Sequence, residues 1–205
     1  MSNTKLLVVL GATGNQGGSV VDTFLDNPSW KIRGLTRNAT SDKATKLAQR
    51  GVEVVSANLD DVSSLDRAFA GAHAIFVVSD FWGIYGDAAN ASKPAEGEPL
   101  NLWAARAEKQ QLIHALEAAS RVPSLERLVL SSLPNCAKMS GGKYKHVYHF
   151  DSKAQAAEHA AVTLPQLWAK TSVFMPGWFL PNYVANPMVM PVRVSAVNLF
   201  FSFSR

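Results

Sequence analysis

Short apolar runs alternate with amphipathic stretches along most of the chain, and glycine, proline or small polar residues separate them. Wholly apolar runs are typical of strands buried on both faces of a parallel sheet, and the stretches between them have helical spacing. The polar segment 81–99, rich in glycine and proline, is expected to be a long irregular loop. The predicted strands are 6–10, 31–36, 52–57, 74–79, 127–131 and 168–174, and the predicted helices are 19–26, 42–50, 62–70, 100–121 and 150–162.

This alternation of strands and helices predicts an α/β fold. Right-handed crossovers would give a doubly wound parallel sheet with the strand order 3-2-1-4-5-6. The chain has 205 residues, of which 47% are hydrophobic, so it can bury a sizeable core in one domain, expected over residues 1–185. In such a sheet, ligands bind at the carboxyl ends of the strands, where the strand order reverses.

Composition narrows the function classes. The apolar runs are too short to cross a bilayer and the N-terminus has no signal-peptide core, which predicts a soluble intracellular protein without a membrane partner. The single cysteine, Cys136, excludes a disulfide framework and a zinc knuckle, and no metal site is predicted. The net charge of +4 slightly favours anionic ligands but is too small to predict direct nucleic-acid binding. The basic segment 138–149 is interpreted as a solvated loop, or else as a contact for phosphate or an anionic substrate.

A glycine-rich turn follows the first predicted strand. Gly11, Gly14 and Gly17 recur at three-residue spacing before a helix that begins near Gln16. The first glycine allows a sharp bend, the second admits a pyrophosphate close to the backbone, and the third lets the helix pack on the sheet. The alternative is an empty structural turn, because turns are rich in glycine for steric reasons alone. Dinucleotide binding would use the turn residues Gly11, Ala12, Thr13, Gly14, Asn15, Gln16 and Gly17.

Arg37 closes the second predicted strand, at the position that distinguishes NAD from NADP. An acidic residue there accepts hydrogen bonds from the ribose 2′-hydroxyl, whereas arginine can grip a 2′-phosphate with two parallel N–H bonds. No Asp or Glu lies between Ser29 and Ser41, and Lys43 follows closely. The sequence therefore predicts NADP, the alternative being a solvated arginine at a strand end.

Further candidates follow the third and fourth predicted strands, at the same edge of the sheet as the glycine turn. Phe81 and Trp82 either wall the nicotinamide region or pack against a neighbouring element. The candidates after the third strand are Asn58, Leu59 and Asp60, on the adenine side, and those at the end of the fourth strand, which faces the cofactor, are Ser79, Asp80, Phe81 and Trp82.

Five motifs occur together along the chain: Gly-Ala-Thr-Gly-Asn-Gln-Gly at 11–17, Leu-Thr-Arg at 35–37, Val-Val-Ser-Asp-Phe-Trp at 77–82, His-Phe-Asp-Ser-Lys at 149–153 and Pro-Gly-Trp-Phe at 176–179. Their combination resembles the NmrA-like family of atypical short-chain dehydrogenases, over about residues 5 to 185. The resemblance implies an NADP-binding Rossmann domain followed by a smaller C-terminal lobe. Some members of that family are redox-sensing regulators that bind transcription factors, and others are oxidoreductases. The cofactor contacts that it implies are Gly11, Thr13, Gly14, Asn15, Gln16, Arg37, Ser79, Asp80, Phe81, Lys153, Trp178, Phe179 and Leu180.

The candidate catalytic residue is Lys153. Typical short-chain dehydrogenases place a tyrosine four residues before a lysine on one helix, so that the two share a face and the tyrosine passes the proton. Here that position holds His149, while Tyr148 lies five residues before Lys153 and on another face. The usual pair is therefore absent.

Three interpretations of Lys153 remain. Lys153 itself acts as acid or base, as in the isoflavone-reductase-like enzymes that this helix also resembles. Alternatively, His149 donates the proton, one turn away. In the third interpretation, Lys153 only grips the cofactor ribose, and the domain reports the NADP level to a protein partner. Ser131 and Ser132 either polarise a substrate carbonyl or form hydrogen bonds at the end of their strand.

The last segment, 186–205, has no counterpart in the resembled family, whose members are usually considerably longer. The C-terminal substrate lobe is therefore expected to be largely missing, as in a truncated product or a mis-spliced gene model, and the tail to be poorly ordered. Val192, Val194 and Ala196 alternate like a strand, which leaves a short pairing with the sheet edge open.

The sequence thus predicts an NADP(H)-dependent oxidoreductase that acts on a small carbonyl or enone metabolite. The alternative is a non-catalytic NADP redox sensor that binds a transcription factor. The expected location is the cytoplasm, with the nucleus as an alternative.

Overall fold

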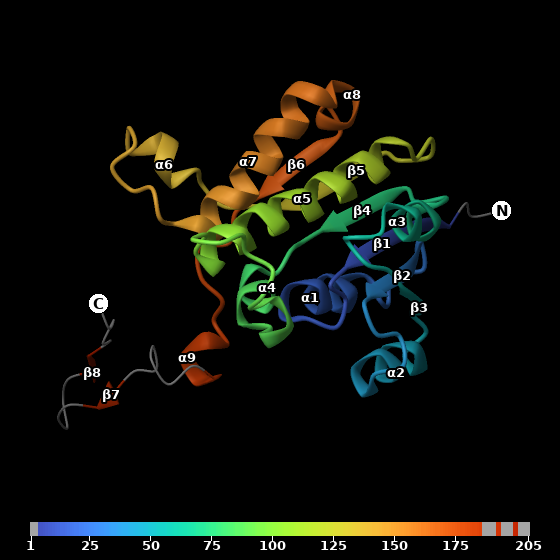
Figure 1. The fold of residues 1–205 in the computed structure, drawn as a ribbon. Coiled ribbons are helices and arrows are strands. Elements are labelled where there is room, and N and C mark those ends of the chain that lie inside the picture. The colour runs from blue at the N-terminus through green and yellow to red at the C-terminus, as the bar shows by residue number, and fades with distance from the viewer. Residues whose placement is uncertain (1–3, 186–191, 194–198, 201–205) are drawn as a thin grey trace. The chain divides into compact units, whose positions relative to one another are not determined.

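The first unit of the chain is a parallel sheet with helices on both faces. The computed structural model describes residues 4–185, 192–193 and 199–200, and the chain divides into two compact units, residues 1–174 and 175–205. The sheet has six parallel strands in the order β3-β2-β1-β4-β5-β6 (Figure 1). The predicted fold class and strand order are therefore confirmed. The strands are β1 (Lys5–Leu10), β2 (Trp30–Thr36), β3 (Glu53–Ser56), β4 (Ala74–Val77), β5 (Arg127–Ser131) and β6 (Thr171–Phe174).

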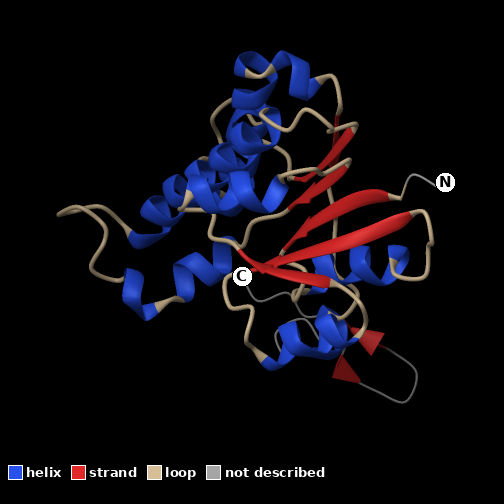
Figure 2. Ribbon diagram, turned by 90° about the vertical axis from the view of Figure 1, so that its right-hand side faces the viewer, coloured by secondary structure: helices blue, strands red, loops and turns tan. Residues whose placement is uncertain are grey.

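Helices connect these strands and cover both faces of the sheet, as Figure 2 shows. Helices α1 and α2 pack on one face, and α3, α5, α7 and α8 pack on the other. The helices of the first unit are α1 (Asn15–Phe24), α2 (Asp42–Gln49), α3 (Val62–Phe69), α4 (Phe81–Gly86), the 3₁₀ turn η1 (Ala88–Asn90), α5 (Leu100–Ser120), α6 (Cys136–Met139), α7 (Tyr148–Thr163) and α8 (Pro165–Trp168).

The core consists of two layers because side chains alternate across each strand. In β1, Val8 and Leu10 join the layer under α3, α5 and α7, whereas Leu7 and Val9 join the layer under α1 and α2. All four side chains are buried, as expected for a central strand covered on both faces.

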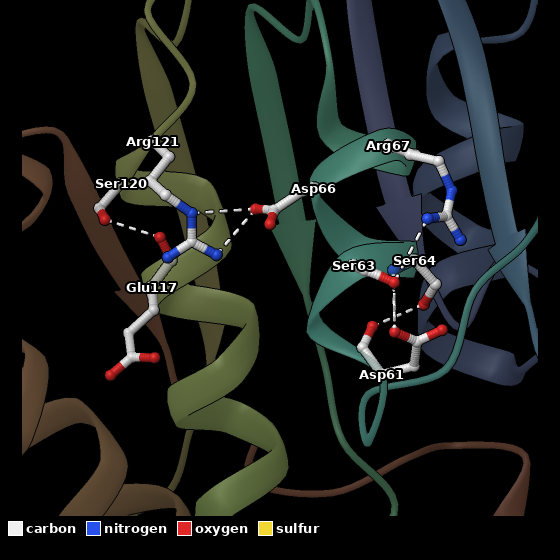
Figure 3. Close-up of polar contacts among 8 residues, drawn as sticks. All are labelled: Asp61, Ser63, Ser64, Asp66, Arg67, Glu117, Ser120 and Arg121. Atoms are coloured by element: carbon white, nitrogen blue, oxygen red, sulfur yellow. Dashed lines mark hydrogen bonds and ion pairs between the residues drawn. The ribbon is translucent and has the colours of Figure 1, made fainter.

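Polar contacts fix α3 and α5 relative to each other at the surface (Figure 3). The guanidinium of Arg121, which follows α5, donates from Nε and Nη2 to Asp66 Oδ1 of α3, at 3.0 and 2.7 Å. At the start of α3, Asp61 accepts hydrogen bonds from the Ser63 hydroxyl and the Ser64 amide, at 2.7 and 3.2 Å. These bonds hold the pKa of Asp61 below its ordinary value.

Segment 81–99 is not wholly irregular, so that prediction was wrong in part. The Asp80 carboxylate accepts from the Gly83 amide at 3.0 Å and begins α4, and Asp87 accepts from the Ala89 amide at 3.0 Å and begins η1. Aspartate caps stabilise short helical turns that hydrophobic periodicity does not reveal.

Other boundaries also differ from the predictions. The strand predicted over 168–174 begins only at Thr171, because Pro165 starts the short helix α8 that ends at Trp168. Within the segment predicted as a basic loop, residues 138–139 belong to α6, whose Cys136 and Ala137 amides donate to the buried Asp151 carboxylate at 2.7 and 3.3 Å. Helix α7 begins at Tyr148 and so includes His149.

The second unit carries three short elements among its described residues. They are α9 (Asn182–Ala185) and the antiparallel pair β7 (Val192–Arg193) and β8 (Leu199–Phe200). Most of the tail predicted to be poorly ordered lies outside the described residues, and the predicted division at residue 185 stays a prediction. No helix in the described part of the chain is long and apolar enough to span a membrane.

Candidate functional site

Three glycines shape the turn between β1 and α1. Gly11 has a φ of +63°, in the region that disfavours side chains, and its carbonyl accepts from the Gly14 amide at 2.9 Å. A Cβ on Gly17 would lie 2.3 Å from the Gly11 oxygen, and one on Gly14 would lie 3.3 Å from the same atom. The turn is thus as tight as the glycine spacing predicts.

The N-terminus of α1 is open to a ligand. Its capping position is Gly14, in extended conformation, and no side chain forms a capping hydrogen bond there. The first amides of α1 therefore lack side-chain acceptors among the described residues, and amides in this position favour an anion.

Gly34 is a further requirement of the turn, and sequence reasoning missed it. A Cβ on Gly34 in β2 would lie 2.9 Å from Ala12 Cβ and 3.1 Å from a Val52 methyl carbon. Its absence allows the Ala12 amide to donate to the Leu35 carbonyl at 3.3 Å, which joins the turn to β2. A glycine within a predicted strand is the signal that indicates such a close approach.

Arg37 lies directly after β2 with an exposed side chain. Its guanidinium forms no hydrogen bond or ion pair with any described residue, while its carbonyl accepts from the Ser56 hydroxyl at 3.3 Å. Arg33 on the same strand is engaged instead, donating to the Ala68 and Ala70 carbonyls, both at 2.9 Å. Of these two arginines, Arg37 is therefore the one whose guanidinium has no partner among the described residues and can bind a phosphate.

The loop after β3 is held against α5. Leu59 provides a carbonyl that lies 2.9 Å from His114 Nδ1, and the Gln111 amide donates to both Asp60 oxygens at 3.1 Å. Asn58 is exposed, and its side-chain oxygen accepts from the Asp60 amide at 3.1 Å. The loop lies at the carboxyl end of β3, and its contacts with the adenine stay predictions.

Glu108, which sequence reasoning missed, is the centre of a buried polar cluster. It lies in the middle of α5 with no exposed surface, and Lys153 of α7 donates to its Oε1 across 2.5 Å. The Ser79 hydroxyl, after β4, donates to the same oxygen at 2.8 Å, and the Ser152 hydroxyl donates to Oε2. The signal in the sequence is a carboxylate in the apolar stripe Ala104, Glu108, Leu112 on one face of a helix.

The Lys153 ammonium keeps one donor for a ligand. Its other two donors go to Glu108 Oε1 and to the His149 carbonyl, the latter at 3.2 Å. An ammonium has three N–H groups, so one has no acceptor among the described residues. The Lys153 side chain is also slightly accessible to solvent.

His149 lies in the first turn of α7 within an aromatic cluster. Its ring centroid lies 5.0 Å from that of Trp82, 5.8 Å from that of Phe81 and 4.7 Å from that of Phe150. Burial, and next the Lys153 ammonium, lower the pKa of His149 below 6.5, although Glu108 and Asp151 oppose this shift. Phe81 is buried, whereas Trp82 is 61% exposed and presents an aromatic surface to solvent.

The lowered pKa of His149 predicts a pH-dependent stability. As the pH falls through about 6.5, the unfolded chain takes up a proton at this residue more readily than the folded chain, so the free energy of unfolding falls over that range. We expect the His149→Phe variant, which keeps an aromatic ring there, to lose less thermal stability between pH 7.5 and 5.5 than the wild type. Thermal unfolding at both pH values checks this, and an equal loss in the two proteins would contradict it.

The remaining candidates have defined positions. The Ser131 hydroxyl donates to Gln16 Oε1 at 3.0 Å, which ties the end of β5 to the glycine turn, and Ser132 is almost fully buried. Tyr148 shares a hydrogen bond of 2.9 Å with His146 Nδ1. The cofactor contacts implied for Trp178, Phe179 and Leu180 fall in the second unit and stay predictions.

The parallel sheet with its tight glycine turn is a Rossmann-type dinucleotide-binding architecture, and comparison with known proteins agrees. The model of the NmrA-like family matches residues 3–195. The NmrA-like family domain-containing oxidoreductase himF of Aspergillus japonicus is 34% identical over 90% of this chain and 50% of its own length. The NmrA-like family domain-containing oxidoreductase FrzB of Cladobotryum sp. is 30% identical over 89% of this chain and 49% of its own length. The chain belongs to the NmrA-like family, and it spans about half the length of these relatives.

Solved structures support the same fold. NmrA, a negative transcriptional regulator in complex with NADP, superposes with a TM-score of 0.61 at 19% identity, over 84% of this chain and 45% of NmrA. The triphenylmethane reductase of Citrobacter sp. complexed with NADP(H) gives 0.56 at 20% identity, over 88% of this chain and 52% of the reductase. At these identities the likeness establishes the fold alone.

Proposed function

We propose that this chain binds NADP(H) and takes part in hydride transfer to a small carbonyl or enone compound. The main observation behind this proposal is the buried Lys153 ammonium. Glu108 holds it in place, and one of its three N–H groups has no acceptor among the described residues. The predicted cofactor residues fit a dinucleotide, since the glycines form a tight turn and no side chain caps the helix that follows it. The oxidoreductase names of the family relatives and the NADP complexes of the structural neighbours support it.

Each part of the site has a role in this proposal. The amides at the start of α1 bind the pyrophosphate and the Arg37 guanidinium binds the 2′-phosphate. NADPH, when bound, supplies the hydride. Lys153 donates its free N–H to the nicotinamide ribose or to the substrate oxygen, and in the second case Nζ gives that oxygen a proton as its carbon accepts the hydride. The exposed face of Trp82, next to His149, would contact a planar substrate.

A second function remains, in which the chain holds NADP and reports it to a protein partner. Position 149 carries a histidine rather than the usual tyrosine, and one structural neighbour is described as a negative transcriptional regulator. In this alternative, Lys153 only holds the ribose. The partner, and the location in cytoplasm or nucleus, stay predictions.

Turnover separates the two functions. We expect the wild type to oxidise NADPH with at least one member of a panel of aldehydes, ketones and enones, and Lys153→Met to lose that activity. Lys46→Met, which changes an exposed lysine on α2, serves as the control and should match the wild type. NADPH binding without turnover across the panel would contradict the enzyme function and favour the sensor.

Arg37→Ala tests the cofactor preference. We expect this variant to lose about 10- to 100-fold in NADP⁺ affinity, the equivalent of a charge-assisted bidentate contact, with the affinity for NAD⁺ unchanged. Lys31→Ala is the control, because it removes an exposed positive charge from the opposite end of β2. Isothermal titration with each dinucleotide measures the effect. An equal loss in both variants would indicate a general charge effect rather than a 2′-phosphate contact.

A further inference from the structure

The buried cluster around Glu108 joins three parts of the fold. Its donors come from the segment after β4 (Ser79) and from two neighbouring residues of α7 (Ser152 and Lys153). Helices α5 and α7 lie side by side over the sheet in Figure 1. The carboxylate therefore connects the carboxyl end of β4 with the helix that carries the candidate catalytic lysine.

The stability of the fold alone does not explain why a carboxylate, Glu108, is buried between α5 and α7. Elsewhere the facing surfaces of α5 and α7 are largely small and apolar, with buried alanines such as Ala104, Ala115, Ala156 and Ala160. Removing a carboxylate and an ammonium from water costs most of what their attraction returns, and a well-packed apolar pair often stabilises a core as well. An apolar pair, however, would not fix an ammonium in one position.

The hydrogen bonds of Lys153 show that Glu108 fixes the position of its ammonium group. The Lys153 stem is flexible, and Glu108 Oε1 and the His149 carbonyl together restrict Nζ to one place. Oε1 is also the acceptor for Ser79, so the same atom sets the position of that hydroxyl at the end of β4. Ser152 holds the other carboxylate oxygen and fixes the plane of the group.

We propose that Glu108 is a positioning residue for NADP binding, which acts through Lys153 by directing the free N–H of the ammonium to the nicotinamide ribose. This inference rests on the proposed function, and on the first of the two roles given there to Lys153, in which its N–H donates to that ribose. Glu108 itself has no exposed surface, so it contacts neither the cofactor nor the substrate.

Two ligands separate positioning from general damage to the fold. NADP⁺ carries the nicotinamide ribose, whereas adenosine 2′,5′-bisphosphate carries only the adenine side and its 2′-phosphate. We expect Glu108→Gln to weaken NADP⁺ binding about tenfold, the equivalent of one charge-assisted hydrogen bond, and to leave adenosine 2′,5′-bisphosphate binding unchanged. Glu117→Gln, which neutralises another carboxylate of α5, is the control and should change neither ligand.

A double-variant comparison tests whether Glu108 acts through Lys153. In the Lys153→Met background, Glu108→Gln should add no further loss of NADP⁺ affinity, because the group that it positions is already absent. Equal weakening of both ligands by Glu108→Gln would overturn the inference. The inference would also be overturned if Glu108→Gln lowered NADP⁺ affinity by the same factor in the wild type and in the Lys153→Met background.

A milder variant covers the case in which Glu108→Gln does not fold. Ser152→Ala removes only the hydroxyl that holds Oε2, and it should weaken NADP⁺ binding about threefold while sparing adenosine 2′,5′-bisphosphate. No change in this variant would then overturn the inference. If the wild type does not bind NADP⁺, both the proposed function and this inference are overturned. If Lys153→Met weakens NADP⁺ binding but Glu108→Gln does not, only this inference is overturned.

Discussion

Replacement of Gly17 by alanine is expected to lower NADP⁺ affinity about a hundredfold, because the turn must open and at least two amide contacts to phosphate are lost. The added Cβ would lie 2.3 Å from the Gly11 oxygen and 2.8 Å from the Leu10 oxygen, and backbone atoms cannot yield as a side chain does. Overpacking of this kind also lowers the free energy of unfolding, here by about 3 kcal/mol. Titration with NADP⁺ and denaturant unfolding measure the two effects.

Gly18→Ala is the matched control, since Gly18 is the next residue of the same helix. A Cβ there would lie 3.6 Å from the Ala12 oxygen, which is an ordinary contact. We expect unchanged NADP⁺ affinity and a gain of up to about 1 kcal/mol, because alanine favours the helix over glycine. Similar losses in both variants would show that the turn does not need glycine at position 17 for steric reasons.

Breaking the Lys153–Glu108 pair from either side is expected to cost about 3 to 5 kcal/mol of unfolding free energy, because each single change leaves a buried charge without its partner. Lys153→Met leaves the wholly buried Glu108 with only the two serine hydroxyls. Glu108→Gln leaves the Lys153 ammonium without a carboxylate. Denaturant unfolding of both variants measures the loss.

The unfolding free energy of the double variant Glu108→Gln/Lys153→Met tests the pairing more directly than that of either single variant. With both charges removed, the loss should be smaller than the sum of the two single losses, and this difference is the coupling energy of the pair. Additive losses would mean that the two residues contribute independently, and the buried pair would then not be the unit that the geometry indicates.

Much of the fold could be predicted because local sequence sets it. The apolar run that forms β1 is short and ends at a glycine, which favours a strand covered on both faces, and the crossover rule then limits the strand order. The places of the glycine turn and of Arg37 in the fold could be predicted for the same reason, since they follow from the ends of β1 and β2, while their contacts with a cofactor stay predictions. The short helices α4 and α6 could not, because aspartate and asparagine caps rather than periodicity begin them.

The polar cluster around Glu108 could not be predicted from the sequence, since it depends on tertiary packing. Glu108 lies 45 residues from Lys153 and 29 from Ser79 in the sequence, and only the packing of α5 against α7 brings them together. Sequence alone presents Ser79 and Lys153 as separate candidates and gives no reason to pair them. Position 108 shows only a carboxylate within an apolar stripe, an inconsistency that marks many functional sites.

Titration of the wild-type protein with NADP⁺ and with NAD⁺ under identical conditions tests whether this chain binds NADP and prefers it to NAD. The Arg37 guanidinium, which has no partner among the described residues, and the uncapped N-terminus of α1 predict that NADP⁺ binds at least about tenfold more tightly, the equivalent of one charge-assisted hydrogen bond. Equal affinities for the two dinucleotides, or binding of neither, would contradict the proposed NADP site.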